Sequence, residues 1–76
     1  MFNAIILTPN RVLFEGAVWS IFLPGATGEF EILEFHKPIV SLLREGKIII
    51  DWKKEFPIKK GAIEMQGDEL VAIVEE

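Results

Sequence analysis

Hydrophobic and polar side chains alternate residue by residue along most of this chain, which is the pattern of β-strands. Such alternation, or a short run rich in β-branched residues, predicts strands over residues 2–7, 12–15, 17–23, 47–52, 55–59, 62–66 and 70–74. Residues 39–43 also fit a helical face, but the run is too short for its period to decide, and we interpret it as a short extended or turn segment. The pattern predicts one all-β domain, residues 1–76, folded as a small antiparallel β-sandwich of about eight to ten short strands.

Apolar residues occupy both faces of the strand predicted at 17–23, where Ser20 is the polar exception. A strand of a small antiparallel sheet usually leaves one face to water, so this pattern indicates either that both faces are covered or that one meets a partner. Trp19 and Trp52 alternate with apolar strand neighbours, which favours the core for both indoles. Pro57 lacks the N–H that a central strand needs, so its strand is expected at a sheet edge or a bulge.

Composition narrows the class of protein. Hydrophobic residues make up 50% of the 76 residues, which is high for so small a domain and suggests that a partner covers part of the apolar surface. The net charge of −4 argues against a nucleic-acid partner, which needs a basic face. No apolar run approaches the length that crosses a membrane, and the N-terminus lacks the pattern of a signal peptide. With no cysteine as well, we expect a complete cytosolic protein without direct membrane insertion.

The stretch from residue 23 to residue 39 shows no period and is predicted to be irregular. An irregular segment held by a regular scaffold is a common place for a binding surface. Gly25 and Gly28 lack the Walker spacing and its lysine, so we interpret them as a chain reversal rather than a phosphate loop. His36, the single histidine, is interpreted as a structural residue of the same loop.

The sequence gives only weak signals for a catalytic site. Glu29, Glu31 and Glu34 lie near His36, but without cysteine or a second histidine they favour a solvated or partner-facing acidic edge over a metal site or a carboxylate pair. The possible nucleophiles stand in no recognisable motif; they are Thr8, Ser20, Thr27 and Ser41. We therefore expect no catalytic residue, no metal and no cofactor, and predict a binding or structural module.

The order of motifs carries a family resemblance over essentially the whole chain. Residues 7–16 read LTPNRVLFEG, residues 24–30 read PGATGEF, residues 32–39 read ILEFHKPI, and residues 46–50 read GKIII ahead of a C-terminal hairpin. This order resembles the N-terminal β-sandwich domain of the epsilon subunit of bacterial F-type ATP synthases. The chain departs from the family at Glu31, where glycine is usual, at residues 34–35, where Pro-Gly is usual, and at Lys37, where a small residue is usual.

The resemblance implies a non-catalytic subunit of the central stalk, peripheral to the cytoplasmic face of the bacterial inner membrane. Its partners would be the gamma subunit and the c-ring of the membrane sector, so that ion translocation is coupled to ATP synthesis. The resemblance puts Glu29 toward the c-ring loops, with Glu31 and Glu34 extending an acidic patch. It puts four residues toward gamma: Thr8, Pro9, Pro38 and Ser41. Family members continue into an inhibitory helical hairpin that this sequence lacks, which implies torque coupling without that inhibition.

Two other functions stay open from the sequence. A free-standing β-sandwich that binds a ligand would use Trp19 or Trp52 as a stacking platform, and buried indoles would exclude it. A small hydrolase built on His36 is the second alternative, and a His36→Ala protein with unchanged properties would exclude it.

Overall fold

The architecture is a β-sandwich in this computed structural model, which describes residues 1–34 and 37–76. His36, expected in the structural loop, lies outside the described residues. The described chain forms nine strands: β1 (Phe2–Leu7), β2 (Val12–Val18), β3 (Ser20–Gly25), β4 (Gly28–Leu33), β5 (Ile39–Leu43), β6 (Gly46–Ile50), β7 (Lys54–Ile58), β8 (Lys60–Gln66) and β9 (Glu69–Glu75). Their number and type confirm the predicted fold class.

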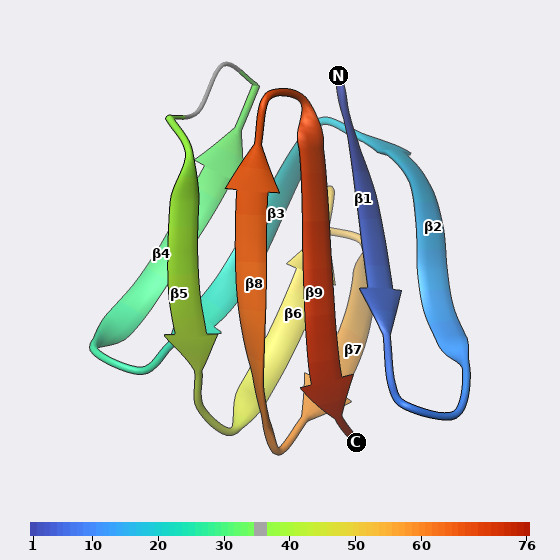
Figure 1. The fold of residues 1–76 in the computed structure, drawn as a ribbon, viewed down its shortest axis with the longest axis vertical. Coiled ribbons are helices and arrows are strands. Elements are labelled where there is room, and N and C mark those ends of the chain that lie inside the picture. The colour runs from blue at the N-terminus through green and yellow to red at the C-terminus, as the bar shows by residue number, and fades with distance from the viewer. Residues whose placement is uncertain (35–36) are drawn as a thin grey trace.

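The strands form two facing layers (Figure 1). The front layer has the order β2-β1-β9-β8-β5, and the back layer has the order β4-β3-β6-β7. The layers are joined along one side by the pairing of Gly25 in β3 with Leu43 in β5. On the opposite side the edge strands β2 and β7 approach through Phe14 and Phe56, whose ring centroids lie 6.0 Å apart. β7 is therefore an edge strand, as Pro57 predicted.

One pairing departs from the expected antiparallel sandwich. β1 and β9 run parallel in the middle of the front layer, with Asn3 opposite Glu69 and Leu7 opposite Ile73. Strands joined by a short turn must run antiparallel, but β1 and β9 are separated by nearly the whole chain, so no turn restricts their direction. Period-two patterns carry no information about such a long-range pairing.

Among the described residues, the core between the layers consists of aliphatic and aromatic side chains and the thioether of Met65, while Thr8 and Ser20 are buried polar residues. It follows the predicted alternation, since Ile48 and Ile50 point inward from β6 while Lys47 and Ile49 do not. The buried hydrophobic residues are Phe2, Ala4, Ile6, Val18, Ile21, Leu23, Ile32, Leu43, Ile48, Ile50, Ile58, Ile63, Met65, Leu70, Ala72 and Val74. No buried side-chain nitrogen or oxygen among the described residues lacks a hydrogen-bond partner.

Two expectations about the elements were wrong. Residues 28–33 were expected to be irregular but form the regular strand β4, in which Ile32 is buried while Glu29 and Glu31 are exposed. Their alternation was present in the sequence but was hidden by the neighbouring Pro and Gly residues. The strand expected at 12–15 continues to Val18 in β2, where Gly16 pairs with Ala4 in β1, so the strand expected at 17–23 is divided at Trp19 between β2 and β3. The extended interpretation of residues 39–43 is confirmed by β5.

Candidate functional site

The part of the chain that the structure describes shows no metal-binding cluster. No group of three or more His, Asp or Glu side chains within residues 1–34 and 37–76 lies together in a way that could hold a metal ion. A search of the same residues finds no helix long and apolar enough to cross a membrane.

The outer face of the front layer carries a continuous row of apolar side chains. Strand register aligns Leu42 with Ala62, Ala62 with Ile73, Ile73 with Leu7, and Leu7 with Val12. We call these five residues the outer apolar row. Leu42, Ile73 and Val12 are exposed by 67%, 54% and 53%, so most of the row faces solvent. Scattered apolar residues are normal on a surface, but a row that crosses five strands indicates a docking face.

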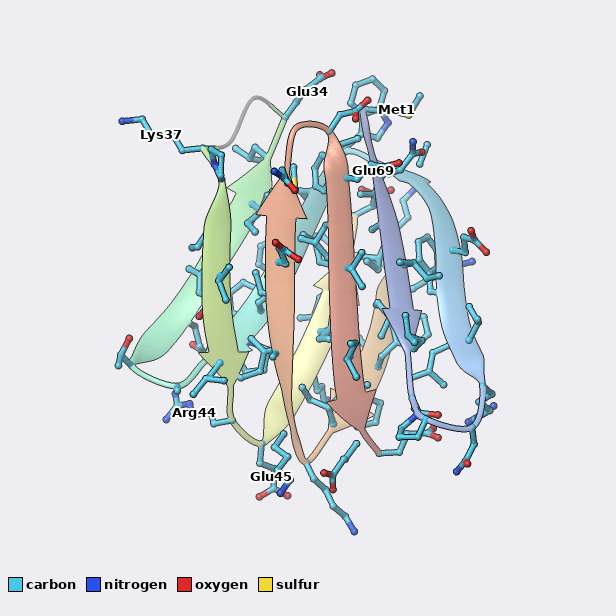
Figure 2. The ribbon with its side chains drawn as sticks, viewed as in Figure 1. Met1, Glu34, Lys37, Arg44, Glu45 and Glu69 are labelled. Atoms are coloured by element: carbon cyan, nitrogen blue, oxygen red, sulfur yellow. The ribbon has the colours of Figure 1, made fainter. Side chains whose placement is uncertain are left out.

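The front face becomes more polar away from the outer apolar row. The next row is mixed: Val40, exposed by 74%, pairs with Glu64, Glu64 pairs with Val71, and Val71 pairs with Ile5. The third row pairs Gln66 with Glu69, and Glu69 with Asn3. The outer apolar row lies near the end of the molecule where Arg44 and Glu45 form the β5–β6 turn, opposite the end that carries Met1 and Glu34 (Figure 2). The exposed apolar side chains are thus densest at one end of the front layer.

The four residues implied to face gamma do not form a single patch. Thr8 is buried, and its hydroxyl accepts hydrogen bonds from the backbone N–H groups of Asn10 and Arg11, each at 3.1 Å. It therefore shapes the β1–β2 turn, where the neighbouring Pro9 is exposed. Ser41 points to the other side of β5 from the exposed Leu42.

Pro38 is exposed and precedes β5 at the far end of the front layer. Thr8 and Pro9 lie at the opposite end, beside the outer apolar row. Of the residues implied to face gamma, Thr8 and Pro9 thus lie beside the outer apolar row, whereas Pro38 lies at the other end of the layer.

The three acidic residues implied to face the c-ring are also spread out. Glu29 is the second residue of β4 and Glu34 follows the end of the strand, a separation of about 16 Å along an extended chain. Glu34 forms an ion pair with the N-terminal amine of Met1 at 2.8 Å (Figure 2). Glu31 accepts a hydrogen bond from the indole Nε1 of Trp52 at 2.8 Å. The carboxylate of Glu29 makes no hydrogen bond or ion pair with any other residue that the structure describes, so it is open to a partner.

Gly25 and Gly28 form the base of the β3–β4 turn that precedes Glu29. Gly25 pairs directly with Gly28, and a Cβ on Gly25 would lie 2.4 Å from the carbonyl oxygen of Gly28. No side chain fits at that position without moving the backbone. Gly28 has a φ of 148°, which other residues rarely adopt. The pair therefore sets the geometry of the turn, which agrees with its interpretation as a chain reversal.

Trp19 and Trp52 were expected in the core, and this was wrong: their exposed fractions are 64% and 60%. Trp19 occupies the corner between β2 and β3, where the chain changes layer. Trp52 occupies the β6–β7 turn. The alternation rule failed for both because each tryptophan lies just beyond the end of a strand rather than inside it. The charged residues Asp51, Lys53 and Lys54 around Trp52 were the available signal of a turn.

The β6–β7 turn is conformationally unusual. Asp51 and Trp52 have φ values of 53° and 56°, and the N–H of Lys53 donates to the carbonyl of Ile50 at 2.9 Å. This is the form of a type I′ turn, which normally has Asn-Gly at these positions. A tryptophan at positive φ costs about 1–3 kcal/mol.

Two contacts hold the Trp52 side chain on the back layer. Its ring lies 5.2 Å from that of Phe22, and its N–H donates a hydrogen bond to Glu31. Asp51 anchors the turn, since its Oδ1 accepts hydrogen bonds from the backbone N–H groups of Trp19 at 2.7 Å and Ser20 at 2.9 Å. The indole is consequently exposed and yet fixed.

Arg11 and Glu76 form the main ion pair beside the outer apolar row. The guanidinium donates from Nη2 to Oε1 at 2.7 Å and from Nε to Oε2 at 3.3 Å. The hydrogen bond to Glu76, with its charge, raises the pKa of Arg11 above its ordinary value. The pair links the β1–β2 turn to the residue that follows β9.

Comparison with known proteins identifies the fold and the family. A family described as "ATP synthase, Delta/Epsilon chain, beta-sandwich domain" matches residues 1–76. The ATP synthase epsilon chain of Chlorobium limicola is 30% identical over 79 aligned residues, which cover 99% of this chain and 90% of the relative. The ATP synthase epsilon chain of a Nitratiruptor species is 39% identical over 74 residues, which cover 92% of this chain and 57% of that relative.

A solved structure agrees with the sandwich. A chain in the cryo-EM structure of the central stalk and c-ring of Tetrahymena thermophila mitochondrial ATP synthase superposes with a TM-score of 0.81. The match covers 97% of this chain and 63% of that one, at 14% sequence identity, and so supports the fold. With residues 1–76 matched by the family, this chain belongs to the delta/epsilon chain family of ATP synthases, through the β-sandwich domain that defines it.

Proposed function

We propose that this chain is a rotor subunit of the central stalk of an F-type ATP synthase, in which it binds the gamma subunit and the c-ring. Members of the family are stalk subunits of a rotary ATP synthase and not catalytic ones, so the chain is not itself an enzyme. In this role it transmits torque from the c-ring to gamma and couples ion translocation to ATP synthesis. Its place would be peripheral, at the cytoplasmic face of the bacterial inner membrane.

The observation that carries the proposal is the outer apolar row. An exposed row across the strands of the front layer is what a subunit needs to bury against a long, rigid partner. We assign the row to gamma, with the β1–β2 turn and the exposed Pro9 at its margin. Side chains at the centre of such a face contribute most to affinity, and Ile73 on β9 is the central exposed one.

Glu29 supports the contact with the c-ring. It is exposed and without an internal partner among the described residues, and it follows the β3–β4 turn at the end of the molecule that also carries the β5–β6 turn. The backbone N–H of Arg44 donates to the carbonyl of Pro24 at 2.9 Å, which ties these two turns together. An open carboxylate on a braced turn suits an arginine of a polar c-ring loop.

The test is co-purification with the gamma subunit of the same source, followed by titration calorimetry. We expect tight binding by the natural chain and a loss of about tenfold or more for Ile73→Lys, since a charge would be buried in the interface. Gln66→Lys is the matched control, because it adds the same charge on the same face outside the row. Glu29→Lys should leave gamma binding unchanged and weaken association of the gamma complex with the c-ring.

The same titration decides the alternative of a free-standing ligand-binding module. The exposed indoles of Trp19 and Trp52 keep that alternative open, because burial of both would have excluded it. A folded natural chain without detectable gamma binding would refute the rotor proposal and favour this alternative.

A further inference from the structure

The back layer carries a second surface, which shares only Glu29 with the proposed c-ring contact and lies on the opposite layer from the outer apolar row. Its centre is Trp52, fixed over Phe22 and hydrogen-bonded to Glu31. Trp52 occupies, at positive φ, a turn position where glycine would fit with less strain, so local folding does not explain the residue. A fixed, exposed indole beside a carboxylate is a platform for a cation.

The strand next to Trp52 has an unused edge. Among the residues that the structure describes, β4 pairs only with β3, so its other edge presents free backbone N–H and C=O groups. An extended segment of a partner can add to such an edge as a further strand. Figure 1 shows β4 as the outermost strand of the back layer, running obliquely behind β5 in this view.

The charges along β4 define what kind of segment fits. Glu29 and Glu31 are both exposed and lie two residues apart, so their side chains project from the same face about 7 Å from each other. Glu29 has no partner among the described residues, and Glu31 is engaged by the neutral indole. The matching segment therefore carries cations at alternate positions. Pairing β4 with a second copy of itself would instead set these glutamates against one another.

We propose that the free edge of β4, together with Trp52, binds an extended segment of a partner protein that carries arginine at alternate positions. The backbone of the segment pairs with β4, and its two guanidinium groups reach Glu29 and Glu31. The guanidinium at Glu31 also stacks on the exposed face of Trp52. Arginine fits better than lysine because its planar group stacks and binds a carboxylate at once. This surface lies on the opposite layer from the outer apolar row, so it does not depend on gamma binding.

The experiment uses fluorescence anisotropy with a labelled extended peptide of sequence TVRVRVT and the full chain. We expect saturable binding that weakens with salt, and a loss of about tenfold for both Trp52→Gly and Glu31→Gln. Trp52→Gly keeps the turn, since glycine favours positive φ. Trp19→Leu and Glu64→Gln are the matched controls, because they remove an exposed indole and an exposed carboxylate elsewhere. Both controls, and Ile73→Lys, should bind like the natural chain.

Several results would overturn the proposal. These are equal binding of TVEVEVT, unchanged binding by Trp52→Gly, and no binding by the folded natural chain up to about 1 mM peptide. Binding of phosphatidylcholine vesicles through Trp52, without peptide binding, would assign the surface to a lipid headgroup and would overturn it as well. A failure here leaves the gamma titration untouched, so the two proposals are judged separately.

Discussion

Asp51 is the residue whose replacement tests the structure most sharply. Its carboxylate accepts hydrogen bonds from two backbone N–H groups, and its own N–H donates to the carbonyl of Ser20 at 3.0 Å, so it joins the β2–β3 corner to the β6–β7 turn. Asp51→Ala removes both acceptor contacts and puts alanine at a φ of 53°. The N–H of Ser20 is shielded, and the loss of its partner costs about 1–2 kcal/mol. The N–H of Trp19 regains water, so its loss costs less, about 0.5 kcal/mol.

Adding roughly 1 kcal/mol for alanine in the left-handed region gives a total of about 3 kcal/mol. For a domain of this size that lowers Tm by about 12–24 °C. Thermal unfolding followed by circular dichroism, with urea titration for the free energy, measures the change. Asp51→Asn is the control, because its amide oxygen still accepts and asparagine tolerates positive φ, so we expect a loss of about 1 kcal/mol. If the two variants agree within about 0.5 kcal/mol, the proposed role of the carboxyl oxygen is refuted.

Three further substitutions test the packing described above. Gly61→Ala should lower the free energy of unfolding in urea by about 2–3 kcal/mol, because the new Cβ would lie 2.6 Å from the carbonyl oxygen of Ile73. Gly16→Ala is the control: its Cβ meets only ordinary contacts, so the free energy of unfolding should fall by less than about 1 kcal/mol. Thr8→Val should lower Tm through the loss of about 1–2 kcal/mol from its turn, and Thr8→Ser should restore most of it. Ile63→Ala should cost about 2–5 kcal/mol in the same assay, since the side chain is 2% exposed, and an unchanged midpoint would contradict the assigned core.

The sequence predicted the parts of the fold that depend on local alternation. Ile48 and Ile50 point inward as expected, and Pro57 lies in an edge strand. Local alternation could not predict the parallel pairing of β1 with β9, because this pairing joins residues from opposite ends of the chain. β4 was missed because the nearby Pro and Gly residues masked a plain alternation around Ile32.

The candidate surfaces were less predictable than the fold. The apolar character of the outer apolar row was visible as an excess of hydrophobic residues, but its members come from five strands and meet only through register. Trp52 could not be placed on the surface from alternation, which continues past the last residue of β6 without a break. The separation of Glu29 from Glu34 also follows from the regular β4, which a loop would not have imposed.

The position of β9 between β1 and β8 has a consequence for biosynthesis. The β1–β2 hairpin is translated well before β9, its neighbour in the sheet, so the front layer cannot close until β9 has been made. Leu7 and Val12 reach the rest of the outer apolar row only through Ile73. A partner that recognises the whole row would therefore bind only chains whose front layer has closed. Binding of the partner would in this way exclude incompletely folded chains from the assembly.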